Sequence, residues 1–295
     1  MGMEILTSYD KRKAQFPLGT PTEFYPGILL ENYPKPNEKY VVLSTTNVRH
    51  ALNDGSYSFY MPLTSYIWNL YGFKSITCLV GNTTEWLNPD SPSNMVVQYL
   101  RKNPENVILF IEASYENQIT VSQTVRLFLG GNIFSDYFLD NTYFITSDAD
   151  LWPLTEKDHS LPDGKSIVIS RPLSRRRKNH HHIALSCIGM TGKIWREVVN
   201  FHDCNQRQRP EGPFYSRYIS DLHLWKTPKP LVRNSTEIIA YLAKKYGKKF
   251  AESQVEASNP DAEKLWFVDQ HLITDLVWAW VERNGGDEGT GIKKI

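Results

Sequence analysis

The chain has 295 residues, of which 41% are hydrophobic and 22% are charged, and its net charge at pH 7 is +1. This composition is that of ordinary globular proteins, so it excludes a disordered, a collagen-like or a coiled-coil chain. The near-neutral charge argues against a dedicated nucleic-acid-binding protein, whose phosphate contacts need an excess of basic residues. The length suits one large α/β domain or two domains of about 150 residues.

Targeting and redox signals in the sequence are few. Three cysteines occur without a CxxC pair, which argues against a disulfide framework and fits a reducing compartment. The first residues carry no apolar stretch after their charges, so we expect no signal peptide. No stretch approaches the ~20 apolar residues of a membrane span. These features predict a soluble, cytoplasmic protein without an integral membrane segment.

The first half of the chain alternates between strand and helix patterns. Residues 1–38 hold five prolines and little periodicity, which predicts an irregular N-terminal arm. Runs of β-branched and aromatic residues then predict strands at 39–46, 75–81, 106–113 and 142–147. Apolar periodicity predicts helices at 62–71, 94–102 and 120–129. This alternation predicts an α/β fold of the Rossmann type, with a mostly parallel central sheet and helices on both faces.

The second half is more mixed. A strand is expected at 165–170, followed by a strand-to-helix unit at 183–201. Asn234, with Glu237 three residues later, predicts the start of a helix that ends near Gly247. A last helix is expected at 260–284. Together these patterns predict one domain over residues 39–284 and a flexible tail at 285–295.

Two carboxylates directly follow the fourth predicted strand. Residues i and i+2 of extended backbone point to the same side, so Asp148 and Asp150 can face one ligand. Their hard oxygen atoms suit Mg²⁺ or Mn²⁺, ions that commonly bridge substrate phosphates. Ligands of such sheets bind at the carboxyl ends of the strands. The pair therefore predicts a metal–phosphate site, and the alternative is a capped turn or a solvated pair.

A third carboxylate lies on an apolar helix face. Asp269 has Trp266, Leu272 and Ile273 as neighbours three or four residues away. A carboxylate in such surroundings is costly unless it is paired or used, and burial raises its pKa towards that of a general base. The alternative is a buried aspartate that caps a helix or forms a salt bridge.

Three segments resemble one enzyme family. YFITSDADLWPL, which holds Asp148 and Asp150, resembles the DxD segment of the GT-A glycosyltransferases, which hold the diphosphate of a nucleotide-sugar with a divalent metal ion. IALSCIGMTGKIWREVV resembles the strand–turn–helix unit on their acceptor side, and WFVDQHLITDL resembles their later Asp-Gln segment. The resemblance covers about residues 40–280. The size also resembles that of the small soluble glycosyltransferases of large algal viruses.

The resemblance implies a function and a cofactor. The expected activity is transfer of a monosaccharide from a nucleotide-diphosphate sugar, a UDP-sugar, to a hydroxyl of a glycan or glycoprotein, with inversion. The expected cofactor is Mn²⁺ or Mg²⁺. Residues 39–150 would be the nucleotide-binding half of a GT-A-like domain, and residues 151–284 the acceptor-binding half.

The resemblance also assigns site residues. The implied metal ligands are Asp148, Asp150 and His271, with His223 as the other candidate for the third position. The implied nucleotide-sugar contacts are Thr45, Thr46, Asn47, Arg126, Asp148, Ala149 and Asp150. The implied acceptor and sugar contacts are Trp152, Gly189, Asp269 and Gln270, with Asp269 as the catalytic base.

Two other functions stay open. A non-catalytic carbohydrate-binding protein on the same fold would bind sugar without turning over a nucleotide-sugar. A phosphatase of the haloacid-dehalogenase type uses DxDx[TV] with the first Asp as nucleophile. Here Leu151 and Trp152 follow the pair, and the motif lies in the middle of the chain.

Overall fold

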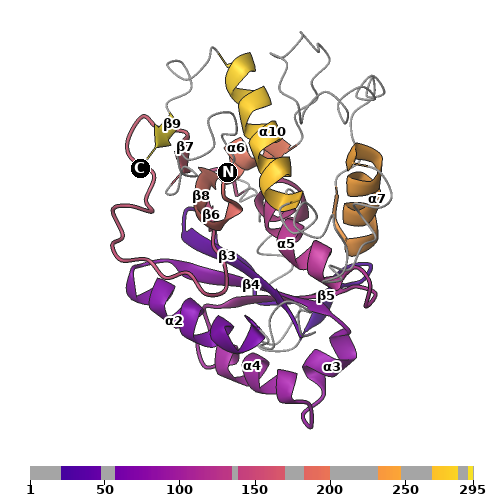
Figure 1. The fold of residues 1–295 in the computed structure, drawn as a ribbon. Helices are drawn as coiled ribbons and strands as arrows, with labels where there is room; N and C mark the ends of the chain where they lie inside the picture. Colours follow the sequence, from indigo (N-terminus) through magenta and orange to yellow (C-terminus); the bar gives the residue numbers. More distant parts are fainter. Residues whose placement is uncertain are drawn as a thin grey trace, which may run out of the picture.

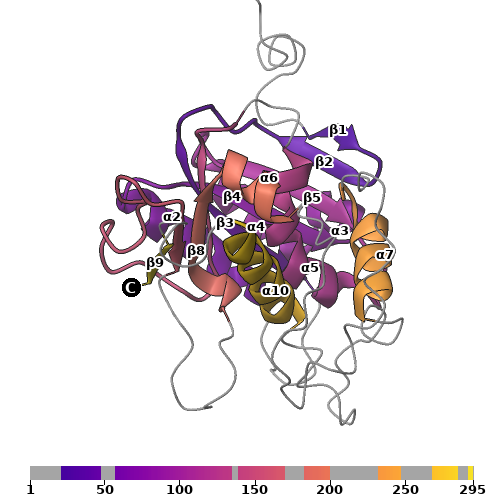
Figure 2. The same ribbon diagram turned by 90° about the horizontal axis from the view of Figure 1, so that it is seen from above.

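The computed structural model describes residues 21–47, 57–134, 139–169, 183–199, 232–246, 268–284 and 292–294. These residues form one nine-stranded sheet in the order β1-β2-β5-β4-β3-β6-β8-β7-β9 (Figures 1 and 2). The strands are β1 (Thr22–Tyr25), β2 (Ile28–Glu31), β3 (Lys39–Thr46), β4 (Lys74–Gly81), β5 (Val107–Glu112), β6 (Tyr143–Thr146), β7 (Ile167–Ile169), β8 (Ile188–Thr191) and β9 (Ile292–Lys294).

The centre of the sheet is parallel, and most of its flanks are antiparallel. β5, β4, β3 and β6 run parallel to one another. β1 pairs with β2, β2 with β5, β6 with β8, and β8 with β7 in antiparallel fashion, whereas β7 and β9 are parallel. The predicted α/β fold is thus confirmed, with a mixed sheet that is parallel only at its core. In the chain, β7 and β8 follow β6, and β8 pairs antiparallel with both of them. The local residue patterns that predict a strand do not predict its direction in the sheet.

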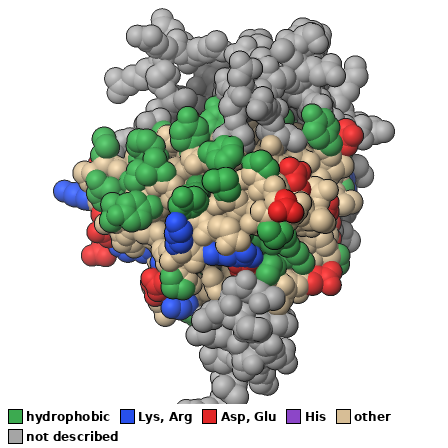
Figure 3. Space-filling view, turned by 90° about the horizontal axis from the view of Figure 1, so that it is seen from below, with side chains coloured by type: hydrophobic (Ala, Val, Ile, Leu, Met, Phe, Trp, Pro, Cys, Tyr) green, Lys and Arg blue, Asp and Glu red, His purple; other side chains and the backbone are tan. Residues whose placement is uncertain are grey.

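Helices cover both faces of the sheet, as Figure 1 shows. The helices on one face are α2 (Met61–Leu70), α3 (Thr83–Leu87) and α4 (Pro92–Arg101). The helices on the other face are α5 (Gln118–Phe128), α6 (Gly192–Val199), α7 (Ser235–Tyr246) and α10 (Val268–Arg283). A buried apolar cluster lies under each layer. The surface of the α2–α4 layer itself carries many apolar side chains (Figure 3).

Two strands lie where the sequence predicts an irregular arm. β1 and β2 form a hairpin whose register pairs Tyr25 with Ile28, so Pro26 and Gly27 make the turn. Gly27 has a φ of 76°, a value that glycine adopts readily at the third position of a Pro-Gly turn. The expectation for residues 1–38 was therefore wrong over the hairpin, because a turn proline was read as a sign of irregular chain.

Later elements agree with the sequence where the structure describes them. The Oδ1 atom of Asn234 accepts a hydrogen bond of 2.9 Å from the backbone N–H of Glu237, which confirms the predicted N-cap of α7. The last predicted helix is described from Val268 onward, and residues 260–267 lie outside the described ranges. Among the described helices, none has the length and apolar composition needed to cross a bilayer.

Candidate functional site

Polar side chains follow all four parallel strands. Asn47 comes after β3, Asn82 after β4, and Asp148 lies two residues beyond β6, while Glu112 is the last residue of β5. Because parallel strands end at the same edge, these residues line one edge of the sheet, the usual place of a ligand in α/β folds.

Arg126 joins two of the predicted site carboxylates. Its Nη1 atom donates to Oδ1 of Asp148 and to the carbonyl of Ser147, each at 2.7 Å. Its Nη2 atom donates to Oδ2 of Asp269 at 3.3 Å, although the two residues lie 143 positions apart in the sequence. α5 brings Arg126 to the end of β6, and α10 packs beside α5 (Figures 1 and 2). The structure therefore gathers Arg126, Asp148 and Asp269 into one cluster.

The three members of this cluster differ in exposure and charge. The side chains of Arg126 and Asp269 are 7% and 8% exposed, whereas that of Asp148 is 43% exposed. Burial raises the pKa of Asp269 to about 7; Arg126 opposes this shift and the charge of Asp148 adds to it. Asp269 can therefore take up or release a proton near neutral pH, which is what a general base requires.

The loop that carries the Asp pair is held against α2. The hydroxyl of Thr64 donates to the carbonyl of Ala149 and accepts a 3.1 Å hydrogen bond from Nε1 of Trp152. Nε1 of Trp68 donates to the carbonyl of Leu151 at 3.3 Å. These bonds fix the loop, while the Asp150 side chain stays exposed.

Two of the three predicted metal ligands are placed where they could bind a divalent ion together. Asp148 and Asp150 offer accessible hard oxygen atoms, which suit a Mg²⁺ or Mn²⁺ ion that completes its shell with waters and phosphate oxygens. Within the described ranges, no three His, Cys, Asp or Glu side chains lie close enough to hold a metal together. The expected third ligand, His271, is therefore not brought to the Asp pair. It lies two residues after Asp269, so the two side chains leave α10 about 200° apart.

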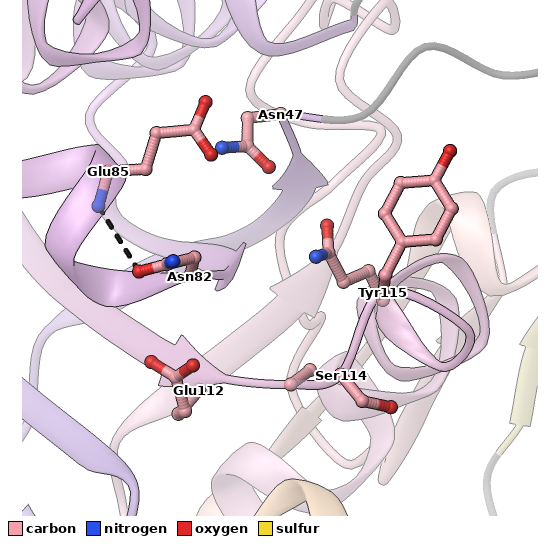
Figure 4. Close-up of a pocket in the computed structure, with 8 residues that line it drawn as sticks. Asn47, Asn82, Glu85, Glu112, Ser114 and Tyr115 are labelled. Atoms are coloured by element: carbon pink, nitrogen blue, oxygen red, sulfur yellow. Dashed lines mark hydrogen bonds between the residues drawn. The ribbon is translucent and has the colours of Figure 1, made fainter.

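A pocket of about 420 Å³ opens at the ends of β3, β4 and β5 (Figure 4). It is lined by Asn47, Asn82, Glu85, Glu112, Ala113, Ser114, Tyr115 and Gln118. Among the described residues, the lining contains amides, carboxylates, a hydroxyl and an aromatic ring but no basic side chain. Such a lining suits the hydroxyls and amide edges of a nucleoside or a sugar better than it suits phosphate.

Two of the three amides in the pocket lining differ in their hydrogen bonding. The hydroxyl of Thr46 donates to Oε1 of Gln118 at 2.7 Å, which orients the glutamine. Nδ2 of Asn47 is buried and has no hydrogen-bond partner among the described residues. Glycine at position 81 leaves space for the Gln118 amide, since a Cβ atom there would lie 2.9 Å from Oε1 of Gln118.

Other predicted site residues lie elsewhere. Thr45 is buried within β3 and does not line the pocket. Gly189 is buried in β8, where a Cβ atom would lie 1.8 Å from the hydroxyl of Tyr143, so packing alone requires a glycine there. Gln270 follows Asp269 on α10, and its backbone N–H donates to Oδ1 of Asp269 at 2.8 Å. His223 lies outside the described residues.

Sequence reasoning missed several residues of the pocket. Asn82 and Glu112 sit at the ends of predicted strands, so the strand-end rule that selected Asp148 could have found them. Tyr115 and Gln118 lie in the turn after β5 and at the start of α5, and no sequence pattern marks them.

Compared with models of known protein families and with curated proteins, the chain matches none.

Proposed function

We propose that this protein is a metal-dependent glycosyltransferase that moves a monosaccharide from a nucleotide-diphosphate sugar to a hydroxyl of a glycan or glycoprotein. The observation that carries the proposal is the cluster in which buried Arg126 holds Asp148, at the end of β6, and Asp269, on α10. One carboxylate is accessible and lies in the DxD segment, and the other is buried with a pKa near neutral.

The nucleoside would occupy the pocket at the ends of β3, β4 and β5. Its amide and carboxylate lining can pair with base and ribose groups. Uracil offers carbonyl and N–H groups to such a lining, and a UDP-sugar is the donor that we expect.

The diphosphate would lie beside the end of β6. Asp148 and Asp150 would hold Mn²⁺ or Mg²⁺ there, and the bound ion would neutralise charge on the leaving diphosphate. Arg126 fixes the orientation of the Asp148 carboxylate through a 2.7 Å hydrogen bond. The position of the Asp148 carboxylate is thus set before the donor binds.

Asp269 would accept the proton of the acceptor hydroxyl. Its pKa of about 7 leaves an appreciable fraction ionised at physiological pH and still allows proton uptake. Attack by that hydroxyl on the face of the sugar opposite the diphosphate would invert the configuration at the anomeric carbon.

The test is thermal unfolding with a panel of nucleoside diphosphates, each with and without Mn²⁺. A ligand at 100 times its Kd stabilises the protein by about 2.7 kcal/mol, which raises Tm by about 5 °C for a chain of this size. We expect UDP to give such a shift only with Mn²⁺, and Asp150→Asn to remove it. Asp163→Asn, which changes an exposed carboxylate outside the site, should keep the shift.

Three results would contradict the proposal. One is the absence of a shift with every nucleoside diphosphate. Another is a sugar-induced shift without release of nucleoside diphosphate from any donor, which would indicate a carbohydrate-binding protein. The third is release of orthophosphate from phosphomonoesters, which would indicate a phosphatase.

A further inference from the structure

Helix α2 turns three large apolar side chains outward. Leu63, Tyr66 and Leu70 remain 46%, 60% and 65% exposed, whereas Thr64 and Ser65 are buried against the sheet. Apolar periodicity places the three larger residues on one face, and in an ordinary surface helix that face would be the buried one. The outer face of α2 is therefore apolar and exposed to solvent.

Polar contacts fix the helix in this rotation. The hydroxyl of Thr64 donates to the carbonyl of Ala149, and Oγ of Ser65 lies 2.7 Å from Oγ of Ser75 in β4. Trp68 lies on the same inner face, where its ring packs against Phe73 and is 1% exposed. Turning the helix to bury its outer residues would break these bonds and expose the tryptophan. The contacts of the inner face of α2 therefore keep its outer apolar side chains exposed to solvent.

The apolar surface extends beyond α2. A 3₁₀ helix (Tyr57–Tyr60) precedes α2, and α4 packs beside α2. We define the outer patch as the exposed large apolar side chains of these three helices: Phe59, Tyr60, Leu63, Tyr66, Leu70, Met95 and Tyr99. They are seven of the ten large apolar side chains exposed in the described part of the chain. Figure 3 shows how densely apolar side chains gather on this face.

The area of the outer patch is that of a stable interface. Its members are on average about 55% exposed, and side chains of this size have about 200 Å² to bury. The seven together offer about 770 Å², above the largest patch of a typical monomer and close to the ~800 Å² per partner of a standard protein–protein interface.

The charge and composition of the outer patch favour a second copy of this chain. Residues 57–73 contain no charged side chain. The cations of α4 are Arg101, which pairs with Glu31, and Lys102, whose Nζ lies 3.8 Å above the ring of Tyr99. Contact of the patch with itself would therefore bring almost no like charges together. Tyr, Phe and Met are the residues enriched in interface cores, whereas a bilayer surface would favour more cations.

We propose that the outer patch is a two-fold interface through which two copies of this chain form a dimer, with α2 of one copy packed against α2 of the other. A self-complementary surface of this kind is what closed two-fold symmetry requires. The proposal does not depend on the activity of the protein.

The test is the molar mass of the full chain by sedimentation velocity over a range of micromolar concentrations. We expect a species of twice 34.1 kDa for the wild type. Tyr66→Glu and Leu70→Glu should each weaken the dimer at least about 100-fold, because every substitution occurs twice and buries two carboxylates. Ala240→Glu on α7, an exposed apolar helical position on the other face of the sheet, should leave the dimer unchanged.

Thermal unfolding checks that the variants keep the fold, and a wild-type chain that stays monomeric at all concentrations overturns the proposal without any variant. A dimer that survives both glutamate substitutions also overturns it, because the contact must then lie elsewhere. A monomer that floats with phospholipid vesicles in a density gradient would assign the outer patch to a membrane surface instead.

Discussion

The buried carboxylate of Asp269 makes the stability of this protein depend on pH in an unusual direction. Its pKa lies at about 7 in the folded protein against 3.8 for an unperturbed group, so the folded state keeps a proton that the unfolded chain releases. Stability is therefore greatest at low pH for this group, falls as pH rises from about 4 to about 7, and stays level above. Between pH 5 and pH 7 the loss is about 2 kcal/mol.

Asp269→Asn should remove this dependence, because asparagine does not titrate. We expect the free energy of unfolding, measured in urea at pH 5 and at pH 7, to fall by about 2 kcal/mol more in the wild type than in the variant. Comparing two pH values cancels the constant cost of depriving Arg126 of a partner. Asp163→Asn should behave like the wild type. Equal pH dependence in the wild type and Asp269→Asn would show that the carboxylate is already ionised at pH 5.

Three further substitutions test the packing by urea unfolding. Gly189→Ala should cost about 3 kcal/mol, since the added methyl group would overlap the hydroxyl of Tyr143; a loss below about 1 kcal/mol would mean that the ring moves freely. Asn234→Ala should cost about 1 kcal/mol through the lost bond to the N–H of Glu237, and an unchanged stability would contradict the N-cap. Gly81→Ala should cost about 2 kcal/mol because its φ of 133° disfavours other residues, and it should weaken UDP binding in the thermal assay. Undiminished UDP binding in this variant would place the nucleoside elsewhere.

Local patterns predicted most elements of the fold and the parallel core of the sheet, but not its antiparallel flanks. Strand β3 was expected at residues 39–46 as the first strand of the chain and is found as Lys39–Thr46, because β-branched residues favour a strand there. The hairpin at Thr22–Glu31 was missed, since its pairing with β5 involves residues about 80 positions away. Long-range pairing of this kind has no local signature.

In the candidate site, too, local patterns identified single residues but not the contacts between them. Asp148 and Asp269 were selected by separate arguments, one from a strand end and one from an apolar helix face. That a single arginine holds both depends on how α5 and α10 pack, which no spacing in the sequence encodes. The outward rotation of α2 was equally hidden, because its inner face buries Met61 and Trp68 in addition to making the hydrogen bonds of Thr64 and Ser65.

The hairpin of β1 and β2 also decides where this chain can be shortened. β2 pairs with residues 108–111 of β5, a strand with the sequence VILFIE in which only the last residue is exposed. A truncated protein that starts at residue 39, the first residue of β3, would leave the backbone N–H and C=O groups of β5 open along one side. Such an edge recruits other strands and causes aggregation. The β1–β2 hairpin, in the segment that the sequence predicts to be irregular, thus protects the edge of β5 from pairing with other molecules. Shortened versions of the protein should therefore retain residues from Thr22 onward.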